Sequence, residues 1–454
     1  MLRLDADLAV RLTVRRAGEP DSSGRCVVYW MQRAQRATDN PALETAIAAA
    51  NELGVPVVVF FGPMPSFPGA NYRHFHFMMQ GLADTAERLE ARGIGLVLRR
   101  LDEGGLAAFC LEAHAALVVS DENPMREPER WRASLAGELR VPFWTVDSDV
   151  VVPSALLERE HYSARTIRPK LRAHLERFLV RAKDRRVRVS WHPPRGMKSL
   201  APRVETLDQM PLDRSVQPAP GVAGGTTEGL RCLRKFLREG LPGYSARRNR
   251  PEVEGTSRLS AYLHFGQLGP RAVALAVSAA HAPGVDREAF LEELIVRREL
   301  SVNFVKFNPR YDRLQGCEAW ALRTLAAHAR DPREHHYSGR QLEDAVTHDP
   351  LWNAAQRQMV RTGWMHGYMR MYWAKKILEW TRSPEGAFEI AVRLNDRYQL
   401  DGRDCNGYAG VAWAVGGKHD RPWGPERPIF GLVRYMNAAG CSRKFDTKAY
   451  IRAM

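Results

Sequence analysis

The chain lacks the cysteine patterns that build disulfide scaffolds and zinc sites. Its 454 residues include only 6 cysteines, and no two of them form a CxxC pair or another metal-ligand spacing. Closely spaced cysteines are what either kind of site normally requires. We therefore expect neither a disulfide scaffold nor a bound metal.

Long hydrophobic runs are also missing. No apolar stretch approaches the roughly 18 residues that a membrane span needs. The N-terminal sequence MLRLDADLAV carries charges where a signal peptide has its apolar centre. These absences predict a cytoplasmic protein with no membrane partner.

Negative charge is scarce relative to positive charge. The chain has 67 Lys and Arg residues against 52 Asp and Glu residues, a net charge of +15. Such an excess favours a polyanionic partner, with nucleic acid ahead of membrane because no basic amphipathic anchor is present. An arginine-rich proteome would produce the same excess, so charge alone leaves the partner open.

The first part of the chain, which we assign as residues 1–186, alternates short Val- and Phe-rich runs with helical segments. This alternation predicts a doubly wound α/β domain around a parallel sheet. The predicted strands are 26–30, 55–61, 95–98, 116–120 and 142–146, and the predicted helices are 41–53, 72–92, 104–114 and 128–139. The first strand lacks the GxGxxG turn of nicotinamide-binding domains and runs into WMQRAQR at the edge where such sheets hold ligands.

A proline-rich stretch predicts an irregular connector over residues 187–225. After the connector the strand signal nearly disappears, and helical periodicity continues through residues 226–454. The helices predicted there are 227–239, 258–263, 270–279, 287–303, 320–330, 350–381 and 384–393. The second domain is therefore predicted to be all-α.

One predicted helical stretch, residues 362–380, carries an unusual stripe. Helical spacing places on one face His366, Arg370, Trp373, Ile377 and Trp380. A core helix with snorkelling polar groups is the simpler interpretation. The acidic loop 401–407, DGRDCNG, can however return a carboxylate to Arg370, because buried charges are seldom left unpaired. Helix and loop together indicate a cofactor pocket.

Two further segments carry groups suited to anions. The basic loop 243–250 and the hydroxyl-rich helix start 255–260 offer a seat for a diphosphate, although an ordinary N-cap beside a surface loop has the same sequence. In a later helix, Glu293 and Arg297 are four residues apart and form either an exposed ion pair or part of a cavity wall.

Tryptophans recur around the same helix. Trp373 and Trp380 are seven residues apart, which places both indoles on one helix face about 10.5 Å apart along the axis. Trp352 precedes Trp373 by 21 residues. Such indoles are usually core packing, but beside a redox cofactor they would form an electron-transfer chain.

These residues carry a resemblance to the photolyase/cryptochrome family. TGWMHGYMRMYWAKK, TSRLSAYLHFGQLGP and LDGRDCNGYAGVAW resemble its flavin-binding segments. HDPLWNAAQRQMV, EELIVRRELSVNF, RPIFGLVRYMN and RKFDTKAYI are typical of class II cyclobutane pyrimidine dimer photolyases. The resemblance covers nearly the whole chain, including VYWMQRAQRATDNPAL, and implies an α/β domain followed by an all-α FAD-binding domain.

The resemblance implies an FAD in the helical domain that is active when fully reduced (FADH⁻). The positions that match the family's FAD contacts are Tyr244, Thr256, Ser257, Arg258, Leu259, Ser260, Arg298, Arg370, Asn395, Asp401 and Asp404. Of these, Arg370 and Asp401 resemble a salt bridge under the isoalloxazine, and Asn395 resembles the asparagine that faces flavin N5. The family's photoreduction chain is matched, in outward order, by Trp373, Trp352 and Trp380.

The implied reaction is light-driven electron transfer from FAD to a cyclobutane dimer flipped out of DNA, which splits the ring. Glu293 resembles the family's lesion-binding glutamate, while Met371 and Trp413 resemble apolar lesion contacts. Arg248 resembles the side chain that fills the gap left in the duplex. On charge alone, the phosphate-contact candidates are Arg427, Arg434, Arg443 and Lys444.

The resemblance also implies an antenna deazaflavin (8-HDF) in the first domain, lined by residues after Trp30. We expect a monomer that acts on UV-damaged DNA in a bacterial-type cytoplasm, at the nucleoid. Three alternatives remain. They are a cryptochrome-like photoreceptor without repair activity, a flavoprotein redox enzyme for small molecules, and a photolyase specific for the (6-4) lesion.

Overall fold

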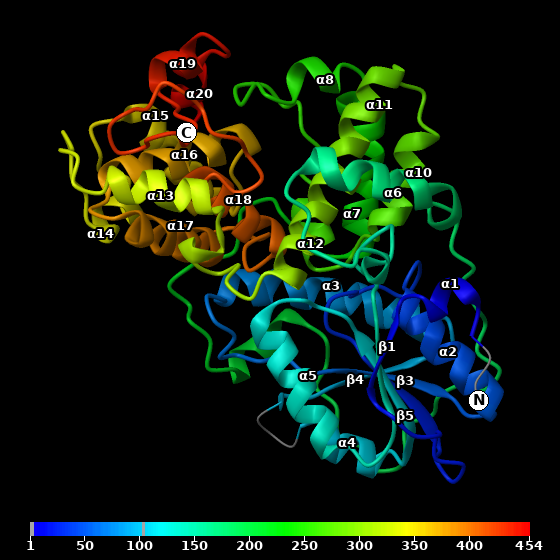
Figure 1. Ribbon diagram of the computed structural model, residues 1–454. Helices are drawn as coiled ribbons and strands as arrows, with labels where there is room; N and C mark the ends of the chain where they lie inside the picture. The colour runs from blue at the N-terminus through cyan, green and yellow to red at the C-terminus, as the bar shows by residue number, and fades with distance from the viewer. Residues whose placement is uncertain (1–3, 102–104) are drawn as a thin grey trace.

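The computed structural model describes residues 4–101 and 105–454 (Figure 1). Residues 1–3 and the predicted helix start at residue 104 lie outside the described residues. A six-stranded sheet forms the first part, in the order β1-β6-β5-β2-β3-β4. Its strands are β1 (Leu12–Arg16), β2 (Cys26–Trp30), β3 (Val57–Phe61), β4 (Gly95–Leu98), β5 (Ala115–Asp121) and β6 (Phe143–Val146).

The five predicted strands are confirmed, but the sheet is not wholly parallel. Strands β2 to β6 pair in parallel, whereas β1 runs antiparallel to β6 at the sheet edge. The sequence LTVRR of β1 escaped prediction because it is an edge strand with little burial: Val14 is 53% exposed. Val- and Phe-rich runs mark strands that are buried on both faces, and β1 is not one of them.

Helices cover both faces of this sheet. Alternate residues of β2 divide between two cores: Val27 and Tyr29 pack with α2 (Pro41–Leu53) and α3 (Tyr72–Glu90). Val28 and its neighbours pack on the other face with α4 (Leu106–Glu112) and α5 (Arg126–Glu138). Since side chains of a strand point to opposite faces in turn, this division is that of a doubly wound sheet.

The segment between the last strand of the sheet and residue 226 contacts both the helical part and the sheet. Helix α6 (Ala164–Phe178) lies among the helices of the second part (Figure 1) and contacts the π-helical segment η5 (Glu292–Arg297). Downstream, the backbone N–H of Trp191 donates to Gly93 and that of Leu200 to Leu98, so the proline-rich stretch lies along the edge strand β4. The connector thereby covers hydrogen-bonding groups at an otherwise open sheet edge.

The rest of the chain is helical, as predicted. Three short helical elements precede residue 226, namely α1 (Ala6–Ala9), η2 (Ser154–Leu156) and η3 (Val204–Gln209). The elements from residue 226 onward are α7 (Thr226–Lys235), η4 (Phe236–Gly240), α8 (Tyr244–Arg247), α9 (Ser260–His264), α10 (Pro270–Ser278), α11 (Gly284–Leu291), η5, α12 (Arg298–Phe307), η6 (Leu314–Gly316), α13 (Ala319–Ala327), α14 (Gly339–Glu343), α15 (Pro350–Thr362), α16 (Gly367–Trp380), α17 (Pro384–Tyr398), α18 (Cys405–Gly416), α19 (Ala438–Ser442) and α20 (Thr447–Ala453). Among the described residues, no helix is long and apolar enough to cross a membrane.

The helix predicted over residues 350–381 is two helices. Helix α15 ends at Gly363, whose φ of 66° is a left-handed conformation that glycine adopts without strain. Helix α16 then begins after His366, whose Nδ1 accepts the backbone N–H of Tyr368 as an N-cap. The prediction that His366 belongs to the helical stripe is therefore wrong, while Trp373, Ile377 and Trp380 are all buried along α16.

Candidate functional site

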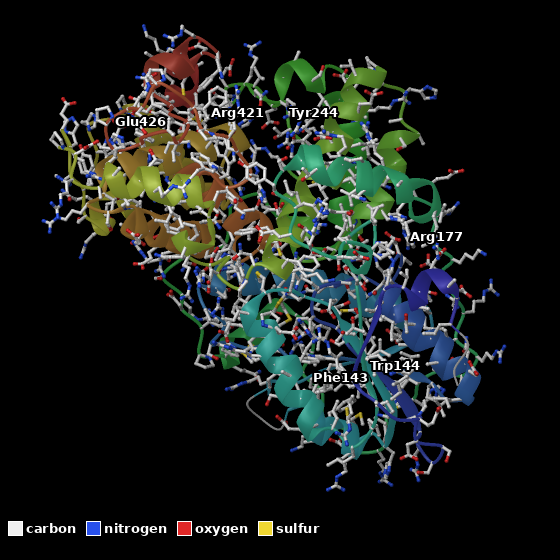
Figure 2. The ribbon with its side chains drawn as sticks, in the orientation of Figure 1. Phe143, Trp144, Arg177, Tyr244, Arg421 and Glu426 are labelled. Atoms are coloured by element: carbon white, nitrogen blue, oxygen red, sulfur yellow. The ribbon has the colours of Figure 1, made fainter. Side chains whose placement is uncertain are left out.

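A cavity opens where α8, α9, η5, α16 and the start of α18 meet. It is lined by Tyr244, Ser257, Ser260, Leu263, His264, Phe290, Glu293, Leu294, Arg298, Arg370, Asp401, Asp404 and Asn406. Figure 2 labels Tyr244 on α8, on the group of helices that faces α15 to α20. The cavity combines guanidinium groups, carboxylates and hydroxyls with an apolar wall. Seven of the eleven residues predicted to contact a cofactor line it.

The other four predicted contacts are Thr256, Arg258, Leu259 and Asn395, and these do not line the cavity. Arg258 lies over the ring of Trp364 at 4.2 Å. The amide of Asn395 is buried and held on both sides: its Nδ2 donates to Asp396 and its Oδ1 accepts from Gln399.

The predicted contact between the helix stripe and the acidic loop is present. Arg370 Nη2 lies 2.9 Å from both carboxylate oxygens of Asp401, and its Nε donates to the carbonyl of Met365. The carboxylate comes from the turn after α17 and meets the first turns of α16. The result is a fixed ion pair on the cavity wall, with its donor groups oriented by the backbone.

A second carboxylate, Asp404, joins the two parts of the protein. It is the N-cap of α18, and its Oδ2 accepts from Arg33 at 2.6 Å and lies 3.1 Å from His264 Nδ1. Burial opposes the charge on Asp404, but the Arg33 guanidinium and the His264 hydrogen bond outweigh it and hold the pKa of that carboxyl well below its usual range. Burial lowers the pKa of His264, so its imidazole is neutral at pH 7.

The same guanidinium extends the network toward the sheet. Arg33 also donates to Asp149 at 2.8 Å, and Asp149 accepts from Arg298 at 2.7 Å. Arg33, Asp149 and His264 were not predicted from the sequence as members of the site. Arg33 lies in WMQRAQR, where the sheet edge was already marked as a ligand region, but nothing in the sequence indicated Asp149.

The proposed lesion residues at the cavity mouth are already paired with each other. Arg248 donates to Glu293 Oε1 at 2.9 Å, with the two side chains 26% and 41% exposed. The alternative pair predicted between Glu293 and Arg297 is wrong, because Arg297 contacts Glu292 at 3.4 Å. The π-helical turn of η5 brings residues five apart together rather than residues four apart.

Three buried indoles are in continuous ring contact, a series that we call the tryptophan stack, and two of them lie on α16, the helix whose Arg370 lines the cavity. The rings of Trp373 and Trp352 are 6.4 Å apart and parallel within 6°, and those of Trp352 and Trp380 are 5.6 Å apart at 69°. Trp352 therefore lies between two tryptophans of the same helix. All three are at most 2% exposed, so Trp380 itself does not reach the solvent.

The other predicted DNA contacts differ in the exposure of their side chains and in whether these are already paired. Trp413 on α18 is half-buried, and Lys375 and Arg434 lie over its ring at 4.8 and 5.7 Å. Arg434 is paired with Asp420 at 3.1 Å, so it is part of the packing around Trp413. Met371 is half-buried, and the exposed members of the set are Arg427, Arg443 and Lys444. These three remain accessible to phosphate.

A second cavity lies at the sheet edge. Its lining includes residues 30–33, Gln35, Phe61 and Trp131, together with His264 from the helical part. This is where residues after Trp30 were expected to hold a ligand. His264 lines both cavities.

Comparisons with known proteins agree on one family. The family model described as DNA photolyase matches residues 27–189. The chain is 47% identical to the deoxyribodipyrimidine photo-lyase of Methanothermobacter thermautotrophicus, over 95% of both chains. It is 43% identical to that of Potorous tridactylus, over 94% of this chain and 80% of the relative. The Arabidopsis thaliana protein of the same name is 40% identical over 97% and 91% of the two chains.

Solved structures give the same fold at lower identity. A class III photolyase from Agrobacterium tumefaciens has a TM-score of 0.72 at 20% identity, over 95% of this chain and 86% of its own. A Synechocystis cryptochrome has a TM-score of 0.73 at 17% identity, over 96% and 89%. The doubly wound sheet joined to a helical body is thus the photolyase/cryptochrome architecture. Given its identity to relatives over almost its full length, the chain belongs to the DNA photolyase family.

The buried network around Asp404 predicts a large loss of stability on neutralisation. Asp404→Asn leaves the Arg33 charge half-compensated, so we expect the free energy of unfolding at pH 7 to fall by about 3 kcal/mol. Asp312→Asn, which breaks the more exposed pair with Arg126, is the matched control and is expected to cost less than about 1 kcal/mol.

Urea denaturation of both variants across pH checks this prediction. The pKa of Asp404 is lower in the folded protein than in the unfolded chain. Its contribution to the free energy of unfolding is therefore complete above the unfolded-chain pKa of about 3.9, and it is lost as the pH falls through the lower pKa of the folded protein. Equal destabilisation by the two variants at pH 7 would contradict it.

Proposed function

We propose that this protein is a light-driven DNA repair enzyme that reverses cyclobutane pyrimidine dimers. The relatives that match almost the whole chain share the name deoxyribodipyrimidine photo-lyase. The observation that carries the proposal is that helix α16 bears both Arg370, which lines the cavity together with Glu293, and Trp373, where a series of three tryptophans in ring contact begins. A cavity for a base and a route for an electron would therefore meet at one helix.

The donor set of the cavity fits an FAD. The hydroxyls of Ser257 and Ser260 and the guanidinium of Arg298 suit a diphosphate, while Leu263 and Phe290 suit an aromatic ring system. The Arg370–Asp401 pair would lie against the polar edge of that ring. Reduced FAD, when bound and excited by blue light, supplies an electron donor. One solved neighbour, an archaeal photolyase from Sulfolobus tokodaii, is described with two FAD molecules.

Glu293 and Arg248 would act on the DNA. A flipped-out dimer presents N–H groups that can donate hydrogen bonds to the Glu293 carboxylate. These hydrogen bonds would fix the orientation of the dimer. Trp413 and Met371 would pack against its apolar faces. Arg248 would leave Glu293 and occupy the space vacated in the duplex, and the exposed cations Arg427, Arg443 and Lys444 would bind phosphates.

Trp373, Trp352 and Trp380 would conduct electrons toward the cavity when the cofactor needs reduction. Asn395 would direct its amide toward the cofactor, with the orientation of that amide set by hydrogen bonds to Asp396 and Gln399. The cavity at the sheet edge would take an antenna chromophore, for which a deazaflavin is the candidate. We further propose that the protein works as a monomer in the cytoplasm.

The test of the function is dimer reversal in a UV-damaged oligonucleotide. Chemically reduced protein is incubated with the DNA in matched blue-light and dark samples, and remaining dimers are counted. We expect loss of dimers only in the light. No loss in either sample, with FAD visibly bound, would favour a photoreceptor of the same fold.

Removing the carboxylate at the cavity mouth should impair repair without removing the cofactor. We expect Glu293→Gln to retain FAD and to lower the repair yield about a hundredfold, as for removal of an oriented charge-stabilising group. Glu292→Gln is the matched control, because that neighbouring carboxylate pairs with Arg168 away from the cavity lining. Repair by Glu293→Gln at the level of this control would exclude Glu293 from lesion binding.

Breaking the tryptophan stack should separate photoreduction from repair. Trp373→Phe is expected to lower the rate of photoreduction to below about a tenth of the wild-type rate, a barrier increase of more than about 1.4 kcal/mol. The same variant, reduced chemically, should still repair dimers. Trp191→Phe, in the connector, serves as control. Wild-type bleaching of the flavin band in Trp373→Phe would refute the assigned chain.

A further inference from the structure

The tryptophan stack continues past Trp380 into an aromatic cluster near the surface. The Trp380 ring lies 5.4 Å from that of Tyr337 and 5.2 Å from that of His348, both edge-on. Tyr337 is half-buried and His348 is exposed, whereas Trp380 is 1% exposed. An electron donor in solution cannot touch Trp380, so its route to the stack passes through this cluster.

Tyr337 and His348 share a hydrogen bond at the phenol oxygen. The Tyr337 Oη lies 2.8 Å from His348 Nδ1 and also accepts the backbone N–H of His348 at 2.9 Å. Among the contacts of the described residues, Nδ1 is the acceptor within reach of the phenol proton, and we assign this hydrogen bond with Tyr337 Oη as donor. The ring of His335 stacks on that of His348 at 3.7 Å and holds it in place.

This partner distinguishes Tyr337 from the indoles before it. The Nε1 of Trp352 donates to the carbonyl of Trp373, and the Nε1 of Trp373 donates to the side-chain amide of Gln356. Neither acceptor is a base. A phenol loses its proton when it is oxidised, so a tyrosine can be oxidised readily only where a base is within hydrogen-bond reach.

We propose that His348 is the proton acceptor that lets Tyr337 serve as the last donor of the chain. An electron passes from Tyr337 to the oxidised ring of Trp380. The Oη–H bond breaks, the proton moves to His348 Nδ1, and a neutral tyrosyl radical faces an imidazolium. A soluble one-electron reductant of the thiol class then reduces the radical, which takes the proton back. The inference rests on the proposed function, since only a light-excited cofactor oxidises the stack.

The charges around His348 favour this role at neutral pH. Burial and the neighbouring His335 lower the pKa of His348, and Lys376 acts in the same direction. Asp349 and Glu334 oppose them without reversing the shift. The imidazole is therefore neutral at pH 7 and able to accept a proton. It loses that ability as the pH falls through a value below about 6.5.

Transient absorption after a blue flash, with FAD bound in its oxidised form, tests the proposal. Wild-type protein should form a tyrosyl radical whose formation slows in deuterium oxide and in acid. Tyr337→Phe should instead retain a tryptophan radical. His348→Gln should slow tyrosyl formation at least about tenfold and remove its pH dependence. His336→Gln changes an exposed neighbouring imidazole and should match the wild type.

A readout that does not involve the cofactor comes from the resting protein in the dark. The ¹⁵N shift of His348 Nδ1 should move in Tyr337→Phe, because the phenol proton that it accepts is removed, and should not move in His336→Gln. Tyrosyl formation at the wild-type rate in His348→Gln, or an unchanged Nδ1 shift in Tyr337→Phe, would overturn the proposal.

These outcomes separate the proposal from the function on which it rests. Dimer repair by chemically reduced protein does not use the tryptophan stack. Normal repair without a tyrosyl signal would reject His348 alone, and a tyrosyl signal without repair would reject the repair function alone.

Discussion

The structure depends on one buried guanidinium. Arg33 leaves the carboxyl end of β2 and is shared by Asp149, from the segment after β6, and Asp404, at the start of α18. Burial penalises its charge, but the two carboxylates outweigh that penalty and raise the pKa of Arg33 above its ordinary value. Buried charges of this kind are tolerated only when all partners are in place. The sheet and the helical body are therefore fixed relative to each other at the cavity.

Two departures from regular helix lie next to the cavity. A π-helical turn carries Glu293, and the break between α15 and α16 precedes Arg370. A regular helix through η5 would have turned Glu293 toward Arg297, away from Arg248. A continuous helix through the break would have displaced the first turns of α16 relative to Asp401. Local irregularity here affects the direction of two side chains that line the cavity, and functional sites are where such irregularities commonly occur.

These irregularities also mark what the sequence could and could not predict. The buried parallel strands and the Arg370–Asp401 pair followed from composition and from the need to neutralise a buried charge. The edge strand β1 did not, because Thr13 and Val14 are exposed and its pattern is weak. The contacts of Arg33 join residues 116 and 371 positions apart, and no periodicity reports such a pairing. The resemblance predicted the order Trp373, Trp352, Trp380, but the parallel and edge-on ring geometry of the two contacts comes only from the fold.

The resting pair between Arg248 and Glu293 has a consequence for the order of events on DNA. While the pair is intact, the carboxylate is half-neutralised and the guanidinium is held at the cavity mouth. In the function that we propose, insertion of Arg248 into a duplex would leave Glu293 without its partner as a flipped base arrives to donate hydrogen bonds to it. The cost of breaking a partly exposed ion pair is small, about 1 kcal/mol or less. The exchange of partners would therefore couple the Arg248–duplex contact to the Glu293–base contact at low energetic cost, because each contact requires the same ion pair to open.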